Sequence, residues 1–206
     1  PFGRKQGGCF ILSGAGGSAM DVTGTQGNDV SHGTTRDDYL DFSQGGNDTV
    51  QGRAGNDNFY LGAAFNAHDS LNGGAGFDTL QLDGSYAGAN ALVMDGSTIK
   101  DFEKIVLDAG NSYTLTTNDG NVAPGTTLTV DASQLGASDT ITFNGRYETD
   151  GHFSFVGGAG DNHLNGGNQS DIFDLTDASQ YKVNGYFGND TFDLGATLVS
   201  SDQVIG

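Results

Sequence analysis

The sequence predicts an all-β fold in which short strands wind into a parallel β-roll, or β-solenoid. Three observations predict it: the glycine content, the choice of acidic residue and a short repeat. Glycine accounts for 35 of the 206 residues, and only two of the 26 acidic residues are Glu, the rest being Asp. Gly and Asp favour turns whereas Glu favours helices, so we expect a chain of turns and strands.

Composition and charge exclude several classes of protein. Hydrophobic residues make up 35% of the chain, against roughly 45 to 50% in an ordinary globular domain, so the core is expected to be thin. The formal net charge of -18 excludes a nucleic-acid binder, because phosphate backbones attract the opposite sign. No apolar run approaches the ~18 residues of a membrane span. Cys9 is the single cysteine, which leaves no intrachain disulfide and no thiolate metal cluster.

The short repeat is a nonapeptide of the form G-G-x-G-x-D-x-U-x, in which U is apolar. Clean copies begin at Gly24, Gly52, Gly73, Gly157 and Gly185, and weaker copies begin at Gly33, Ser43, Ala64 and Gly166. Six residues form a turn, and the last three form a very short strand whose apolar residue points inward. The predicted inward residues are Leu40, Val50, Phe59, Leu71, Leu80, Leu164, Phe173 and Phe192.

A longer repeat is superimposed at an offset of 133 residues, where at least eleven identities occur without a gap. Asp38, Gly52 and Asp57, for example, recur as Asp171, Gly185 and Asp190. The last copy stops at Gly206, where its earlier counterpart Gly73 continues into a full nonapeptide. We therefore expect this chain to be a fragment of a longer repetitive protein.

The repeats divide the chain into four stretches. We expect lead-in strands over 1–23, a first repeat block over 24–81, an intervening β-strand segment over 82–156, and a second block with a truncated repeat over 157–206. The intervening segment either continues the solenoid with longer turns or forms a separate small β-sandwich. Its predicted strands are Leu92–Met94, Ile99–Leu107, Tyr113–Thr116, Thr127–Val130, Thr140–Phe143 and Phe153–Val156. The charged run Lys100, Asp101, Glu103 and Lys104 is interpreted as a solvated strand face.

The spacing of the Asp residues points to calcium. Two nonapeptides make one coil of ~18 residues, so turns on one side stack at a strand spacing of ~4.8 Å. Carboxylates at that spacing repel by on the order of 1 kcal/mol per pair even in water. A Ca²⁺ ion between two turns would lie ~2.4 Å from each, whereas Mg²⁺ requires shorter distances and stricter geometry. The stacked pairs are Asp29 over Asp48, Asp38 over Asp57, Asp48 over Asp69, Asp57 over Asp78, and Asp171 over Asp190.

These nonapeptides resemble the RTX (repeats-in-toxin) family, the calcium-binding β-roll of bacterial proteins exported by type I secretion. The resemblance covers residues 24–81 and 157–206, and it implies that several Ca²⁺ ions bind to position-six carboxylates and turn carbonyls. The implied carboxylates are Asp29, Asp38, Asp48, Asp57, Asp78, Asp171 and Asp190, with Asp69 weaker because its turn lacks glycine. The implied carbonyls belong to Gly24, Gln26, Gly27, Gly33, Gly46, Gly52, Ala54, Gly55, Gly73, Gly74, Gly76, Gly157, Gly160 and Gly188.

Three departures from the pattern bear on the number of ions. Asn162 replaces one Asp and keeps only a neutral oxygen, Arg36 replaces a turn glycine, and Tyr181 falls where the first block has Asp48. We therefore expect the second block to bind fewer or weaker ions than the first.

No catalytic motif accompanies the repeats. An EF-hand needs a Glu to close its loop, and neither Glu103 nor Glu148 does so. The four histidines, His32, His68, His152 and His163, are scattered, and there is no H-E-x-x-H, G-x-S-x-G or Walker motif.

We expect no catalytic residues and no enzyme activity in this chain. The favoured interpretation is a calcium-dependent structural module of a secreted, extracellular protein at the bacterial cell surface, of adhesin, S-layer or matrix type. Its partners would be calcium ions and further copies stacked end to end. The alternative is the calcium-dependent folding and secretion module of a secreted protease, lipase or epimerase whose catalytic domain lies outside this sequence.

Overall fold

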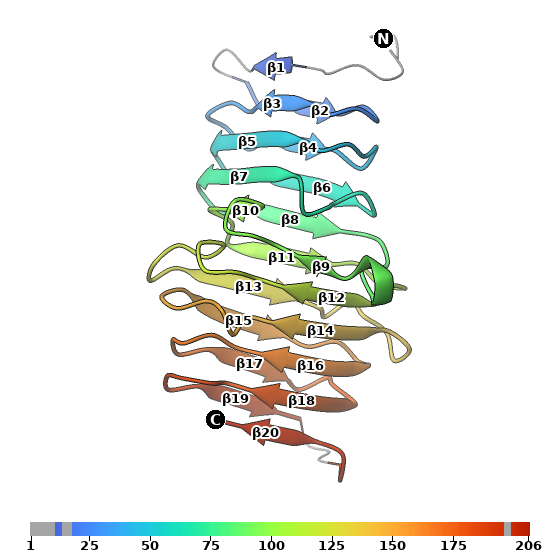
Figure 1. The fold of residues 1–206 in the computed structure, drawn as a ribbon, viewed down its shortest axis with the longest axis vertical. Helices are drawn as coiled ribbons and strands as arrows, with labels where there is room; N and C mark the ends of the chain where they lie inside the picture. Colours follow the sequence, from blue (N-terminus) through green and yellow to red (C-terminus); the bar gives the residue numbers. More distant parts are fainter. Residues whose placement is uncertain (1–10, 14–17, 196–198) are drawn as a thin grey trace.

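A computed structural model describes residues 11–13, 18–195 and 199–206. In this part of the chain the strands pair in parallel and stack along one long axis, in sequence order within each sheet, from β1 (Ile11–Ser13) to β20 (Gln203–Ile205) (Figure 1). One short 3₁₀ helix, η1 (Gly88–Asn90), interrupts the strands. The predicted all-β parallel β-solenoid is thus confirmed. No helix in the described ranges is long and apolar enough to cross a membrane.

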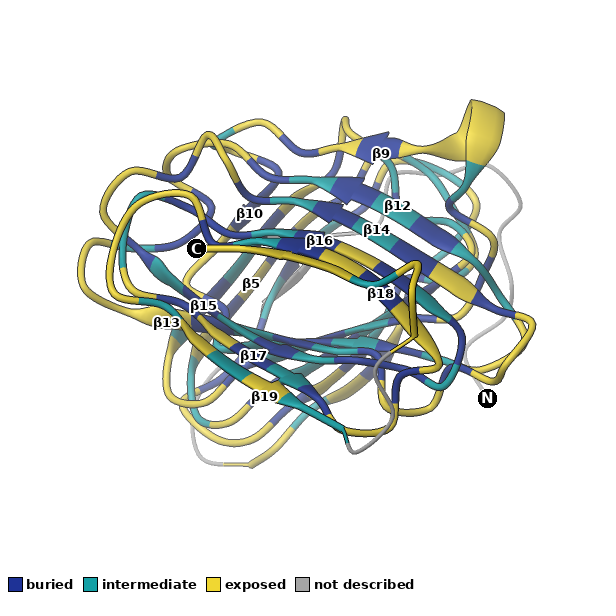
Figure 2. Ribbon diagram, turned by 90° about the horizontal axis from the view of Figure 1, so that it is seen from below, coloured by how far each residue is buried: buried dark blue, intermediate teal, exposed yellow. Residues whose placement is uncertain are grey.

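The strands form two layers that face each other across a narrow interior (Figure 2). One layer is a nine-stranded sheet. Its strands are β2 (Asp21–Thr23), β4 (Tyr39–Asp41), β6 (Asn58–Gly62), β8 (Thr79–Leu82), β11 (Lys104–Leu107), β13 (Thr127–Asp131), β15 (His152–Val156), β17 (Ile172–Leu175) and β19 (Thr191–Leu194).

The other layer consists of two sheets placed one after the other along the axis. The five-stranded sheet contains β1, β3 (Val30–His32), β5 (Thr49–Ala54), β7 (Ser70–Ala75) and β10 (Ile99–Lys100). The six-stranded sheet contains β9 (Leu92–Val93), β12 (Tyr113–Thr116), β14 (Thr140–Asn144), β16 (Asp161–Asn165), β18 (Gln180–Asn184) and β20.

Because each coil passes from one layer to the other and back, its turns lie along two edges of the roll. We call the edge where the chain enters the nine-stranded sheet the entry edge; its turns are 33–38, 55–57, 76–78, 101–103, 117–126, 145–151, 166–171 and 185–190. We call the opposite edge, where the chain leaves that sheet, the exit edge; its turns include 24–29, 42–48, 63–69 and 157–160.

The core is a single column of apolar side chains between the layers. Seven of the eight predicted inward residues are at most 1% exposed, and Phe192 is partly buried against the same core. Towards the C-terminus the column becomes aromatic: Phe155, Phe173 and Phe192 stack with successive ring centroids 4.9 Å apart. In-register pairing of their strands brings these rings together, since parallel strands repeat the same position in each coil.

The intervening segment continues the solenoid. Strands β11, β13 and β15 connect β8 to β17 within the nine-stranded sheet, so the alternative of a separate β-sandwich is wrong. The predicted single strand Ile99–Leu107 is also wrong, because β10 and β11 belong to opposite layers. Asp101 turns the chain between them with a φ of 53°. The pattern of apolar residues does not reveal a turn at this position, because the residues on both sides of the turn are in extended strands.

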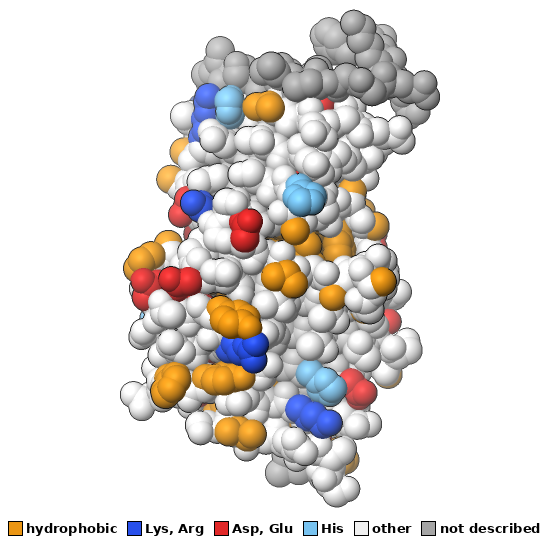
Figure 3. All heavy atoms as spheres, viewed as in Figure 1, with side chains coloured by type: hydrophobic (Ala, Val, Ile, Leu, Met, Phe, Trp, Pro, Cys, Tyr) orange, Lys and Arg blue, Asp and Glu red, His pale blue; other side chains and the backbone are white. Residues whose placement is uncertain are grey.

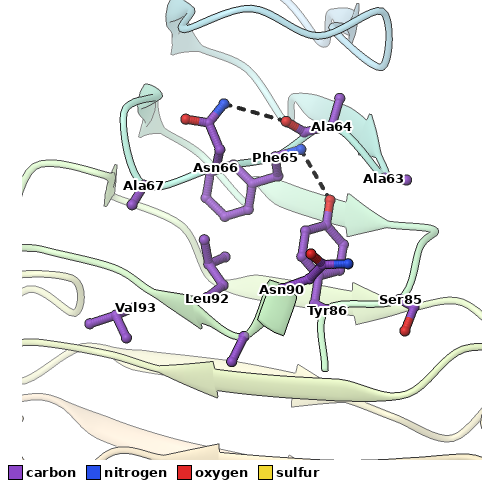
Figure 4. Close-up of a pocket in the computed structure, with 11 residues that line it drawn as sticks. Ala63, Ala64, Phe65, Asn66, Ala67, Ser85, Tyr86, Asn90, Leu92 and Val93 are labelled. Atoms are coloured by element: carbon purple, nitrogen blue, oxygen red, sulfur yellow. Dashed lines mark hydrogen bonds between the residues drawn. The ribbon is translucent and has the colours of Figure 1, made fainter. Parts of the chain in front are cut away.

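The second layer changes sheets within the long coil between β8 and β11. This coil supplies β10, the last strand of the five-stranded sheet, and β9, the first strand of the six-stranded sheet. Figure 4 shows the hollow at this junction, where the Phe65 N–H donates to the Tyr86 hydroxyl at 3.0 Å. The same hydroxyl donates to the Gly62 carbonyl at 2.7 Å. The residues that line the hollow include no acid, so it is distinct from the carboxylate sites described next.

Candidate metal centre

The position-six Asp residues form columns along the two edges of the roll. Each of these residues directly precedes a strand, so the parallel register of the strands places its carboxylate above that of the next coil. On the exit edge the column contains Asp29, Asp48 and Asp69; on the entry edge it contains Asp38, Asp57 and Asp78, followed further along by Asp171 and Asp190. Apart from the partly exposed Asp190, these residues are at most 3% exposed.

Backbone hydrogen bonds join the coils within each column. In every case the N–H of one Asp donates to Oδ1 of the Asp in the following coil. These bonds are Asp29 to Asp48 at 2.9 Å, Asp38 to Asp57 at 2.8 Å, Asp48 to Asp69 at 2.7 Å, Asp57 to Asp78 at 2.8 Å and Asp171 to Asp190 at 2.9 Å. The structure therefore brings together all five pairs of carboxylates expected from the spacing, and it commits one oxygen of each lower carboxylate to the backbone.

The second carboxylate oxygen has no hydrogen-bond donor at the centre of the entry edge. Oδ2 of Asp57 and Oδ2 of Asp78 are both buried without a partner. The glycine at the start of each turn lets these oxygens approach the backbone closely: a Cβ on Gly52 would collide with Asp57 Oδ2 and lie 2.5 Å from the Gly73 carbonyl oxygen. A Cβ on Gly73 would lie 2.7 Å from Asp78 Oδ2 and collide with the carbonyl oxygen of Asp101.

Carboxylate and carbonyl oxygens from successive coils thus lie close together beside glycines that carry no side chain. Hard oxygen donors of this kind are the ligands that Ca²⁺ takes in proteins. Buried oxygens without donors are costly unless a cation or another partner satisfies them. The residues therefore fit calcium, which when bound supplies positive charge between the coils.

The pKa values of the Asp residues in the columns reflect the same lack of positive charge near their carboxylates. Burial, reinforced by the neighbouring carboxylates and opposed by the backbone hydrogen bonds, raises the pKa of Asp48, Asp57 and Asp78 to about 6. The pKa of Asp171 is likewise raised to about 6, mainly by burial, and burial also raises the pKa of Asp69. At neutral pH an ionised column is therefore unfavourable by itself.

Other carboxylates in the columns receive donors from their own turns. The N–H of Thr34 donates to Asp38 Oδ2 at 2.6 Å, and its hydroxyl donates to Asp38 Oδ1 at 2.9 Å. Thr25 contacts Asp29 in the same way. The N–H of Gly167 donates to Asp171 Oδ2 at 2.7 Å. The pair Asp57 and Asp78 thus keeps two buried carboxylate oxygens without a donor, which favours a cation at this position.

Side-chain amides satisfy two of the turn carbonyls that were predicted to bind calcium. In the exit-edge turn before Asp69, Nδ2 of Asn66 donates to the Gly46 carbonyl at 2.8 Å. Nδ2 of Asn162 donates to the carbonyls of Gly158 at 2.9 Å and Gly160 at 2.7 Å. The neutral side-chain oxygen that Asn162 keeps in place of a carboxylate accepts the Gly158 N–H at 2.9 Å. In these turns the amide N–H groups satisfy carbonyl oxygens that a cation would otherwise bind.

Among the remaining predicted carbonyls, four lie against the glycine of a neighbouring coil. Each of these carbonyl oxygens would lie within 2.5 Å of a Cβ added to the facing glycine. The Gly27 oxygen faces Gly46, the Gly52 oxygen faces Gly33, the Gly55 oxygen faces Gly76, and the Gly73 oxygen faces Gly52. This close packing requires glycine, because a Cβ at any of these positions would overlap the facing carbonyl. The carbonyls of Gly24, Gln26, Gly33, Ala54, Gly74, Gly76, Gly157 and Gly188 stay predicted ligands.

The entry-edge column contains an acid that sequence reasoning missed. Oε2 of Glu103 accepts the N–H of Asp78 at 2.7 Å, which is the bond that Asp residues accept in the coils above. The interpretation of Glu103 as part of a solvated strand face is therefore wrong. Lys104, from the same run, pairs with Asp131 at 2.7 Å. The available signal was an acid one coil after Asp78, but the coil is lengthened and the acid is Glu.

The second block presents a shorter column. On its exit edge, Asn162 and Tyr181 occupy neighbouring in-register positions, and the Tyr181 N–H donates to Asp202 Oδ1 at 3.2 Å. On its entry edge the described column consists of Asp171 and Asp190. The expectation that this block binds fewer or weaker ions stays a prediction.

Comparison with known families agrees with this geometry. The model of the RTX calcium-binding nonapeptide repeat matches four copies, at residues 23–41, 43–66, 64–84 and 154–177. No curated protein and no solved structure matched the chain. The matched ranges contain the columns of both blocks with the exception of Asp190 and Glu103. The chain therefore carries four copies of the RTX calcium-binding nonapeptide repeat, and it winds as a parallel β-roll.

Proposed function

We propose that this module is a calcium-gated structural element that folds after secretion and has no catalytic role. The observation that carries the proposal is the pair of buried, donor-free carboxylate oxygens of Asp57 and Asp78, which face carbonyl oxygens of the next coil. Without a cation these oxygens repel one another and lack partners. With calcium the same arrangement stabilises the stack of coils.

Calcium concentration would then determine where the chain folds. An ion that binds only the folded state stabilises that state by RT ln(1 + [Ca²⁺]/Kd) at each site, so several modest sites add up. Extracellular calcium modules use dissociation constants of ~10⁻⁴ to 10⁻³ M. The net charge of -18 opposes collapse where calcium is scarce. The chain would remain unfolded in the cytosol and fold outside the cell.

We propose further that the module belongs to a bacterial surface or matrix protein, such as an adhesin or S-layer component. The recurrence of the repeat at an offset of 133 residues supports a structural role, because a folding appendage of an enzyme needs only one such block. End-to-end stacking of copies stays a prediction from the sequence.

The test is a far-UV circular dichroism titration of the chain from EDTA into millimolar CaCl₂, with MgCl₂ as the ion control. We expect a cooperative coil-to-β transition with calcium alone. The double variant Asp48→Ala, Asp57→Ala should require more calcium, whereas Asp177→Ala, which alters an exposed acid outside the columns, should behave as wild type. A chain that is fully β in EDTA and indifferent to calcium would contradict the proposal.

A further inference from the structure

A second group of acids lies on the entry edge within the intervening segment. One carboxylate oxygen from each of Asp119, Glu148 and Asp150 lies within 4.8 Å of the others. Asp119 comes from turn 117–126 and the other two come from turn 145–151, which lead into the neighbouring strands β13 and β15. All three residues lie outside the four matched nonapeptide ranges.

The central member of this group is a buried carboxylate with an unsatisfied oxygen. Glu148 is 0% exposed. Its Oε1 accepts the N–H groups of Asp150 at 3.3 Å and Gly151 at 3.1 Å. Its Oε2 is buried and has no hydrogen-bond donor, which is the condition found for Asp57 and Asp78 in the repeat columns. A buried carboxylate oxygen of this kind requires a compensating partner.

No basic side chain of the described residues supplies that partner. The ion pair found among these residues joins Lys104 to Asp131, and the Lys and Arg side chains on the face seen in Figure 3 are scattered rather than clustered. Arg146 belongs to the same turn as Glu148, but its guanidinium lies 4.5 Å from the centre of the exposed Tyr147 ring. The three carboxylates therefore lie together without a Lys or Arg paired to them in the described ranges, and Glu148 is the buried member of the group.

Contacts between coils hold the group in place. The N–H and hydroxyl of Thr149 donate to Asp119 Oδ1 at 3.1 Å and 2.6 Å, which ties the two turns together. On the other side, the Glu148 carbonyl accepts the Asn168 N–H at 3.0 Å. The group thus lies between the Asp38–Glu103 column and the Asp171–Asp190 column along a single edge.

We propose that Asp119, Glu148 and Asp150 bind a calcium ion at a site that does not derive from the nonapeptide repeat. The donors are carboxylate oxygens from two coils, which suit a hard cation, and the group contains no His or Cys to favour zinc. Two oxygens on opposite sides of Ca²⁺ are separated by about 5 Å, which agrees with the span of the group. The bound ion joins turn 117–126 to turn 145–151. It also adds a cation site on the entry edge between the two repeat blocks.

The test counts bound calcium on the full chain by equilibrium dialysis against ⁴⁵Ca²⁺. We expect Glu148→Gln and the double variant Asp119→Asn, Asp150→Asn each to bind one ion fewer than wild type. The matched control Asp177→Asn, an exposed acid outside the group, should bind the wild-type number. The double variant changes two exposed residues, so it remains informative if Glu148→Gln fails to fold.

An unchanged number of ions in the folded double variant would overturn the proposal. A second measurement is the anomalous scattering of a terbium-soaked crystal. A peak among the three carboxylates would support the site, and peaks confined to the Asp columns would overturn it. The calcium-driven folding transition is read separately, so the proposed function and this site can fail independently.

Discussion

Replacing Asp57 by Asn is expected to change the stability of the roll in opposite directions with and without calcium. Burial and the carboxylates of Asp78 and Asp38 raise the pKa of Asp57 to about 6 from its ordinary 3.8. Each unit of that difference corresponds to about 1.4 kcal/mol, so ionised Asp57 costs the folded state on the order of 3 kcal/mol at neutral pH. Asn removes that cost, and it brings amide N–H donors, which at Asn162 satisfy the turn carbonyls of Gly158 and Gly160.

The assay is urea unfolding followed by circular dichroism, in EDTA and in millimolar calcium. In EDTA, Asp57→Asn should be more stable than wild type by up to about 3 kcal/mol. In calcium the order should reverse, because the variant loses a charged ligand from two adjacent sites. Asp177→Asn, which neutralises an exposed carboxylate, controls for the change in net charge. A variant that is less stable than wild type in EDTA would refute the reasoning that unpaired charge destabilises the column.

Three further outcomes are expected. Asn162→Asp removes the donors to the Gly158 and Gly160 carbonyls, so it should destabilise the roll by about 1 to 3 kcal/mol in EDTA; urea unfolding should show calcium restoring part of that loss. Phe173→Ala removes a fully buried ring that stacks on two others and should cost about 3 to 5 kcal/mol with or without calcium; a loss seen only in EDTA would contradict a core role. The raised pKa values near 6 in the columns favour the protonated folded state, so their stabilisation is complete below about pH 4 and is lost as the pH rises through 6. Thermal scans in EDTA should therefore give a higher melting temperature at pH 5 than at pH 7, while the calcium midpoint shifts to higher concentration at pH 5; a melting temperature that falls on acidification would contradict this sign.

The repeat blocks were predictable because their period is local. Each nonapeptide specifies its own turn and its own inward residue, as Leu40 and Phe59 illustrate. Once the coil length is known, the stacking of Asp38 on Asp57 follows from strand register. Sequence reasoning was less successful where coils lengthen. The coil between β8 and β11 contributes one strand to each of the two sheets of the second layer. No local sequence pattern predicts this change from one sheet to the next.

The sequence by itself determined the all-β class, the solenoid winding, the inward apolar column and the pairing of carboxylates, because each depends on a short period that parallel strands repeat in every coil. Only the tertiary structure decided which oxygens remain without donors. Whether Asp57 Oδ2 is free, whether Asn162 satisfies a turn, and whether Glu103 or Glu148 joins the entry edge all depend on which turns lie against one another. The physical reason is that each of these outcomes depends on which donor atom lies next to a given oxygen, often in another coil. The spacing of residue types along the chain does not specify the partner of an individual atom.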